Sequence, residues 1–102
     1  MKYQIKKLNS WIHYCKSLSI LHYYVIYSVG GEVVEITLHK HKEYWTALSE
    51  CAGYTHENKI PTWDFSMKAL VLTTKEIASN MKFYADVCRA EGLREIQKKF
   101  GE

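Results

Sequence analysis

Residues 20–39 read ILHYYVIYSV-GG-EVVEITLH and carry the strongest local signal for a fold in this chain. Both runs that flank Gly30-Gly31 are rich in β-branched and aromatic residues, the composition typical of strands. Both glycines can adopt the positive φ that a primed two-residue turn requires. The stretch therefore predicts a β-hairpin with strands over 20–29 and 32–39.

A two-residue turn at this point also fixes the register, because opposite residues must then sum to 61 in number. One face of the hairpin is continuous and apolar, with the pairs Tyr27–Val34, Val25–Ile36 and Tyr23–Leu38. We expect this face to pack against helices. A slip of one residue would exchange the two faces.

The other face of the hairpin is mixed and carries the candidate site. It pairs Tyr24 with Thr37, His22 with His39, and Ile26 with Glu35, and it continues to His41 beside Lys40. A solvated strand face explains this pattern, and so does a contact surface for a partner protein or a second copy of the chain. A zinc site on His22, His39 and His41 is a less favoured interpretation, because only Glu35 or a distant cysteine could complete it.

Upstream of the hairpin, Met1, Tyr3 and Ile5 alternate as in a short strand. The following segment has helical spacing, with apolar residues at Trp11, Ile12, Cys15 and Leu18. Downstream, residues 42–52 read as a second helix with a stripe of Trp45, Leu48 and Ala52, and residues 54–64 read as a loop.

The C-terminal third is predicted to contain a strand and two helices. Residues 67–73 form a short apolar run typical of a buried strand. Thr73 and Glu76 stand at the spacing of a capping box and open a helix, which Gly92 breaks or ends. Residues 93–100 then form an amphipathic tail.

The resulting order is β-α-β-β-α-β-α in a single domain over 1–102. We expect an α+β fold: an antiparallel sheet of three or four strands with helices on one face. The first six elements match the ferredoxin-like split βαβ pattern, followed by a C-terminal helix. If the short first strand is absent, a three-stranded sheet with three or four helices remains.

Composition restricts the compartment and the partners. The net charge of +3 permits anionic partners without demanding them, and it argues against a mimic of nucleic acid, which would need a strongly acidic surface. Three cysteines without a C-x-x-C motif are typical of reduced thiols in the cytoplasm. The longest apolar run, residues 23–27, is far too short to span a membrane, and the N-terminus does not read as a signal peptide.

Motifs for catalysis and cofactor binding are absent from the sequence. It has no glycine-rich phosphate loop and no Gly-x-Ser-x-Gly elbow. Nucleic-acid binding is the second interpretation, since five lysines could contact phosphates and Tyr3 or Tyr24 could stack on bases. The lysines in question are Lys6, Lys7, Lys16, Lys40 and Lys42.

These observations favour a small non-enzymatic protein, without a cofactor, that acts as an inhibitor or adaptor by occupying another protein. The predicted contact residues are His22, Tyr24, Glu35, His39, Lys40, His41 and Trp63. Trp63 joins the set because tryptophan is enriched in binding hot spots. Compact domains of this kind also occur among phage inhibitors of host machinery, including anti-CRISPR proteins, which extends the expectation by analogy to counter-defence in a bacterial host.

Overall fold

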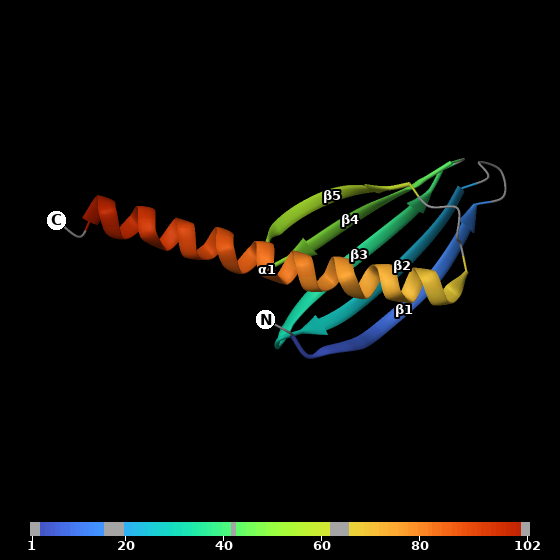
Figure 1. Ribbon diagram of the computed structural model, residues 1–102, viewed down its shortest axis with the longest axis horizontal. Helices are drawn as coiled ribbons and strands as arrows, with labels where there is room; N and C mark the ends of the chain where they lie inside the picture. The colour runs from blue at the N-terminus through green and yellow to red at the C-terminus, as the bar shows by residue number, and fades with distance from the viewer. Residues whose placement is uncertain (1–2, 16–19, 42, 62–65, 101–102) are drawn as a thin grey trace.

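The computed structural model describes residues 3–15, 20–41, 43–61 and 66–100. It contains one antiparallel sheet and one long helix (Figure 1). The elements are β1 Ile5–Cys15, β2 Ile20–Val29, β3 Glu32–Lys40, β4 Trp45–Cys51, β5 Tyr54–Ile60 and α1 Met67–Phe100. The five strands are neighbours in sequence order, β1-β2-β3-β4-β5. Helix α1 crosses one face of the sheet, and its C-terminal part extends past the sheet (Figure 1).

The central hairpin is confirmed in both its turn and its register. Gly30 and Gly31 have φ values of 56° and 84°, as a primed turn requires. Tyr27 pairs with Val34 and His22 with His39, so opposite residues sum to 61. Beside the turn, a Cβ on Gly30 would lie only 3.0 Å from the ring of Tyr3, which gives a second reason for glycine there.

The core lies between the sheet and α1. The helix contributes one buried stripe, formed by Leu70, Thr74, Ile77, Ala78, Met81 and Ala85. Because Ala78 and Ala85 are small, the helix can lie close to the sheet, over large side chains such as Tyr23 and Tyr27. The buried hydroxyls of Tyr27 and Thr74 share a hydrogen bond of 2.7 Å. This bond satisfies the one polar atom that Tyr27 brings into the core.

The ferredoxin-like prediction is wrong. The sheet has five strands in simple meander order, instead of the predicted three or four, and α1 is the one helix among the described residues. The predicted helices around Trp11 and over 42–52 correspond to β1 and β4, and the predicted loop over 54–64 contains β5. The predicted strand over 67–73 is the beginning of α1.

The first error arises because β1 carries large apolar residues on both of its faces. Trp11 lies opposite Tyr24 and Ile12 lies opposite Tyr23, so adjacent apolar residues point to opposite sides of the sheet. The register also shifts between Lys7 and Asn9, which interrupts the period of two. Such a strand has no clean alternation for sequence analysis to detect.

The second error arises because β4, apart from Trp45, buries small or polar residues and exposes a leucine. Its inward set is Trp45, Ala47, Ser49 and Cys51, all buried. Ser49 is tolerated there because its hydroxyl donates a hydrogen bond to the carbonyl oxygen of His56 at 3.2 Å. Leu48 faces away from the core and is 51% exposed, yet its spacing from Trp45 imitates a helical stripe.

The hairpin that joins β4 to β5 escapes sequence analysis because its turn carries only one glycine. Ala52 and Gly53 have φ values of 54° and 85°, so this turn has both central residues at positive φ, like Gly30-Gly31. Alanine in that region costs about 1 kcal/mol, and Asn or Gly is the usual sequence signal. The strand that follows, β5, is mostly exposed and polar, so its sequence resembles a loop.

Helix α1 begins earlier and ends later than the sequence indicates. Ser66 caps it: its hydroxyl accepts the backbone N–H of Ala69 at 3.2 Å. The expected cap at Thr73 and Glu76 lies inside the helix, and so does Gly92. Over the residues that the structure describes, no helical segment is long and apolar enough to cross a membrane.

Candidate functional site

The face of the sheet opposite α1, here called the open face, is covered by no described element (Figure 1). Strand pairing assigns its members. They are Lys6, Asn9, Trp11 and His13 of β1; His22, Tyr24, Ile26 and Ser28 of β2; Val33, Glu35, Thr37 and His39 of β3; Thr46, Leu48 and Glu50 of β4; and Thr55, Glu57 and Lys59 of β5. Four of the five histidines belong to this side, because His41 stacks on His39 just after β3.

Six rings form a continuous stack across the open face, here called the ring ladder. Its members in order are Trp11, Tyr24, His22, His39, His41 and Tyr44. Successive ring centroids lie 4.4–5.8 Å apart, and successive planes differ by 10–27°. At the far end, Nζ of Lys59 lies 4.3 Å from the centroid of the Tyr44 ring, as in a cation–π contact.

Strand geometry produces the ring ladder in two ways. Trp11 with Tyr24, and His22 with His39, are directly opposite pairs on neighbouring strands, whose Cβ atoms stand about 5 Å apart. His22 and Tyr24 are two residues apart on one strand and therefore share a face. The ring ladder thus depends on β1 lying beside β2.

Stacking covers both faces of the inner rings, so that their remaining polar contacts are made at the ring edges. His22 has Tyr24 on one side and His39 on the other, and His39 has His22 and His41. The edges of these rings carry the N–H, imine nitrogen and O–H groups, which form directional hydrogen bonds. Trp11 closes the ladder and is 45% exposed.

The ring ladder does not present a metal site. A metal bound by an imidazole lies in the ring plane, along the nitrogen lone pair, and the planes of stacked rings run side by side instead of meeting at a nearby point. Accordingly, the described residues include no group of three or more His, Cys, Asp or Glu side chains placed to hold a metal ion. The structure does bring the three predicted zinc ligands, His22, His39 and His41, close together, but it stacks their rings face to face.

One hydrogen bond ties the ring ladder to β4. Nε2 of His41 lies 3.0 Å from the hydroxyl oxygen of Thr46. A histidine beside a hydroxyl resembles the base and nucleophile of an acyl-transfer site, which also needs a third group to orient the base. Within the described part of the chain, no carboxylate is hydrogen-bonded to His41.

Burial and two neighbouring imidazoles lower the pKa of His39 below its usual 6.5, with burial the larger cause and His22 and His41 adding to it. The unfolded chain therefore binds a proton at His39 more readily than the folded protein does. The stabilisation from neutral His39 is complete above pH 6.5 and is lost as the pH falls through the lowered pKa.

We expect the free energy of unfolding to fall between about pH 7.5 and about pH 5.5, measured by urea denaturation at a series of pH values. His39→Phe should make this slope shallower, because it keeps a ring in the stack and removes the titrating group. Tyr44→Phe, which keeps a ring at the end of the stack and leaves every histidine in place, should leave the slope unchanged. An equal slope in His39→Phe and wild type would contradict the assignment.

A shallow hollow of about 220 Å³ lies beside the middle of the ring ladder. Its lining residues are His22, Thr37, His39, Thr46, Leu48 and Glu57. The lining thus combines two imidazoles, two hydroxyls, one apolar side chain and one carboxylate. This mixture suits a side chain with an apolar stem and a polar end.

The structure assembles most of the predicted contact residues on one surface. His22, Tyr24, Glu35, His39 and His41 all belong to the open face. Lys40 does not, because it pairs with Leu21 and Trp45 and so has the parity of the helix-covered face. Trp63 lies outside the described residues.

Sequence analysis misses the part of this surface that lies outside the central hairpin, including Trp11, His13, Tyr44, Thr46 and Leu48. All five fall in, or directly beside, segments whose apolar spacing resembles that of a helix. Only the weak alternation of Trp45, Ala47, Ser49 and Cys51 could have indicated that β4 is a strand. Once β4 is a strand, Thr46 and Leu48 must face the same side as His39.

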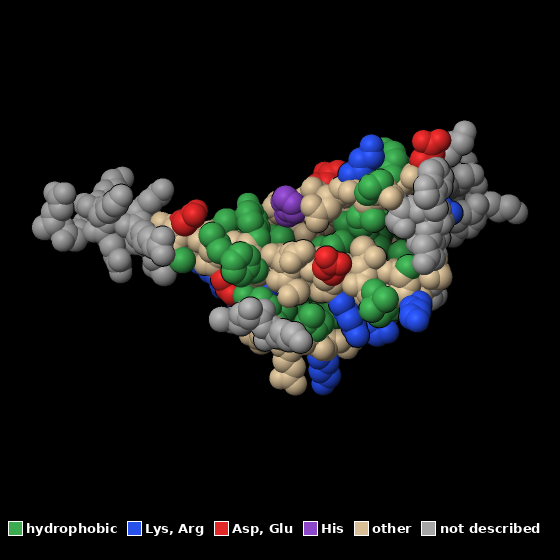
Figure 2. All heavy atoms as spheres, in the orientation of Figure 1, with side chains coloured by type: hydrophobic (Ala, Val, Ile, Leu, Met, Phe, Trp, Pro, Cys, Tyr) green, Lys and Arg blue, Asp and Glu red, His purple; other side chains and the backbone are tan. Residues whose placement is uncertain are grey.

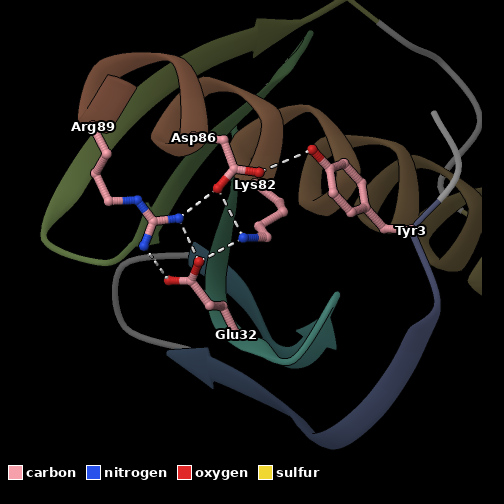
Figure 3. A network of polar contacts seen from close by, with 5 residues as sticks. All are labelled: Tyr3, Glu32, Lys82, Asp86 and Arg89. Atoms are coloured by element: carbon pink, nitrogen blue, oxygen red, sulfur yellow. Dashed lines mark hydrogen bonds and ion pairs between the residues drawn. The ribbon is translucent and has the colours of Figure 1, made fainter. Parts of the chain in front are cut away.

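A second polar cluster joins α1 to the beginning of β3 (Figure 3). Nζ of Lys82 lies 2.5 Å from Glu32 and 2.8 Å from Asp86. Arg89 contacts the same two carboxylates, and Tyr3 donates a hydrogen bond to Asp86 at 3.1 Å. Hydrogen bonds from the two cations lower the pKa of Glu32 and of Asp86. The cluster is saturated with internal partners and fastens the helix beside the Gly30-Gly31 turn.

Three further features of the molecule lie outside the open face. Burial raises the pKa of the Cys51 thiol, which disfavours the reactive thiolate. A hollow of about 180 Å³ between β4, β5 and α1 is lined by Ser49, His56, Asn58, Ile77, Asn80, Met81 and Tyr84. Apolar side chains are also exposed along α1 (Figure 2), among them Leu72 and Phe83.

Comparison with known proteins identifies no relative: no family model matches the chain, and no curated protein or solved structure matches it either.

Proposed function

We propose that this chain is a small non-enzymatic protein-binding domain, of the inhibitor or adaptor kind, that binds its partner with the open face. The observation that carries the proposal is the ring ladder. It gathers six aromatic and imidazole side chains on one uncovered surface, and because the inner ring faces are covered, polar contacts with a partner would be made at the ring edges. Aromatic residues of this kind are enriched at protein interfaces.

Exposed apolar side chains on the same surface support the proposal. Trp11, Val33 and Leu48 are each about half exposed. Contact of apolar surface with water is unfavourable, and a bound partner would remove that contact. They surround polar groups rather than forming a continuous apolar patch. That mixture is typical of interfaces whose two sides are also stable apart.

The same geometry supports a protein partner over a nucleic acid. Binding of single strands by stacking requires ring faces onto which bases can lie. Within the ring ladder, Tyr24, His22, His39 and His41 each have a ring on both sides. Only the terminal rings could offer a face, and Lys59 lies over the Tyr44 ring.

A comparative capture experiment tests the proposal. The tagged protein is incubated with bacterial lysate, with and without nuclease treatment, and retained proteins are quantified by mass spectrometry for wild type and for two double variants. Trp11→Ser with Leu48→Ser alters the open face, and Leu72→Ser with Phe83→Ser alters two exposed apolar positions on α1. We expect a partner that the α1 variant retains and that the open-face variant loses about tenfold or more.

Thermal unfolding of both variants provides the folding control, because none of the four side chains is buried in the core. Equal retention by wild type and the open-face variant would contradict the proposal. So would binding that disappears on nuclease treatment, which would favour nucleic acid.

A further inference from the structure

Three glutamates lie on the open face beside the ring ladder. Glu35 of β3 and Glu50 of β4 are directly opposite each other, and Glu57 of β5 is opposite Leu48. All three side chains are exposed. They therefore form a band of negative charge across three neighbouring strands.

This band has no cation of its own among the described residues. Glu35, Glu50 and Glu57 form no ion pair with another described residue, whereas Glu32, Lys82, Asp86 and Arg89 pair with one another near the hairpin turn. Of the two lysines of the open face, Lys59 stands two residues from Glu57 on β5 and its Nζ lies over the Tyr44 ring, and Lys6 is opposite Ser28 at the other edge of the sheet. The open face thus carries more glutamate than lysine, although the whole chain has a net charge of +3.

The pairing of Glu35 with Glu50 weakens the sheet. Like charges directly opposite each other on neighbouring strands are destabilising. A cationic group placed over these two strands would convert the repulsion into attraction for both carboxylates. The charge pattern is therefore complementary to a basic surface.

We propose that the open face binds a basic segment of a partner protein, whose Lys or Arg side chains pair with Glu35, Glu50 and Glu57 while Trp11 and Leu48 provide apolar contact. This inference rests on the proposed function and names the chemistry of the partner. Charge complementarity of this kind sets specificity and speeds association.

The hollow beside the ring ladder suits such a side chain. Glu57 and Leu48 both line it, so a carboxylate and an apolar surface are close together. Lys and Arg side chains combine a long apolar stem with a charged end, and guanidinium can bind a carboxylate through two parallel hydrogen bonds. One Arg or Lys could place its stem against Leu48 and its charge at Glu57.

The test is a selection of random peptides of about twelve residues, displayed on phage, against three immobilised proteins. They are the wild type, the open-face variant Glu35→Gln/Glu50→Gln/Glu57→Gln, and the control variant Glu43→Gln/Glu76→Gln/Glu91→Gln. Both variants remove three exposed carboxylates, and only the first removes them from the open face. Selected peptides are then synthesised and their affinities measured at two salt concentrations.

We expect wild type and control to select peptides enriched in Lys and Arg, and the open-face variant to bind those peptides about tenfold more weakly or worse. Its unfolding midpoint should be no lower than that of wild type, because the substitution removes a like-charge pair.

Neutral or acidic peptides that lose affinity on Trp11→Ser/Leu48→Ser would overturn this inference and leave the proposed function standing. Some selected peptides could bind the triple glutamine variant and Trp11→Ser/Leu48→Ser as tightly as they bind wild type. That result would overturn both this inference and the proposed function. Binding of a labelled single-stranded oligonucleotide that depends on Trp11 would also overturn the inference, since a polyanion would then be the occupant.

Discussion

Replacing Trp45 with alanine is expected to lower the free energy of unfolding by about 4 kcal/mol, a large fraction of the total for a domain of this size. Trp45 is 1% exposed and belongs to the cluster of buried side chains between the sheet and α1. Truncation removes its buried apolar area and leaves a cavity that β4, paired on both sides, cannot collapse to fill. Urea denaturation measures the change.

Leu48→Ala is the matched control, because it separates the strand from a helix over the same residues. A helix would place Leu48 on the buried stripe with Trp45, whereas in β4 its side chain belongs to the open face. We therefore expect Leu48→Ala to cost less than about 1 kcal/mol. A loss at Leu48 comparable to that at Trp45 would be inconsistent with the strand.

Replacing Glu32 with glutamine is expected to cost about 2 kcal/mol at neutral pH. Glu32 pairs with both Lys82 and Arg89, and the Lys82 side chain is only 10% exposed. Glutamine keeps the shape of the side chain and removes its charge, so the partly buried ammonium of Lys82 retains only Asp86 as an anionic partner. Loss of one partner from a buried ion pair costs more than loss at an exposed site.

The pH dependence of this cost identifies its electrostatic origin. The folded-state pKa of Glu32 lies below its usual 4.5, so its stabilisation is complete above pH 4.5 and disappears as the pH falls through the lowered pKa. The difference between wild type and Glu32→Gln, followed by urea denaturation from about pH 7 to about pH 3, should therefore shrink toward zero. Glu76→Gln, at an exposed position of α1, should change little at any pH. A Glu32→Gln cost that stays constant with pH would indicate packing instead of charge.

Glu32 and His39 lose their contributions to stability in different pH ranges. The stabilisation from His39 is lost below its usual pKa of 6.5, and that from Glu32 and Asp86 only below 4.5 and 3.8. The two substitutions can therefore be separated in one series of pH values. Replacing either residue should flatten the plot of unfolding free energy against pH only in the pH range where that residue is protonated.

The central hairpin, and with it about half of the candidate site, follows from the amino-acid sequence alone. The two glycines specify the turn through their backbone freedom, and the turn together with the period of two assigns His22, Tyr24, Glu35 and His39 to one face. This information is local, because it lies within 20 consecutive residues and needs no distant contact. Local backbone preferences are therefore sufficient to set the register of β2 against β3.

The identities of β1, β4, β5 and the first turns of α1 depend instead on tertiary contacts. Short apolar runs are compatible with both helix and strand, and the choice depends on what covers them. β4 is a strand because β3 and β5 pair with it on either side, and residues 67–73 are helical because Leu70 and Thr74 continue the buried stripe of α1. The ring ladder needs β1 beside β2, so only the assembled sheet brings Trp11 into line with His22 and His39. Pairing between strands is a non-local interaction, and local sequence patterns carry little information about it.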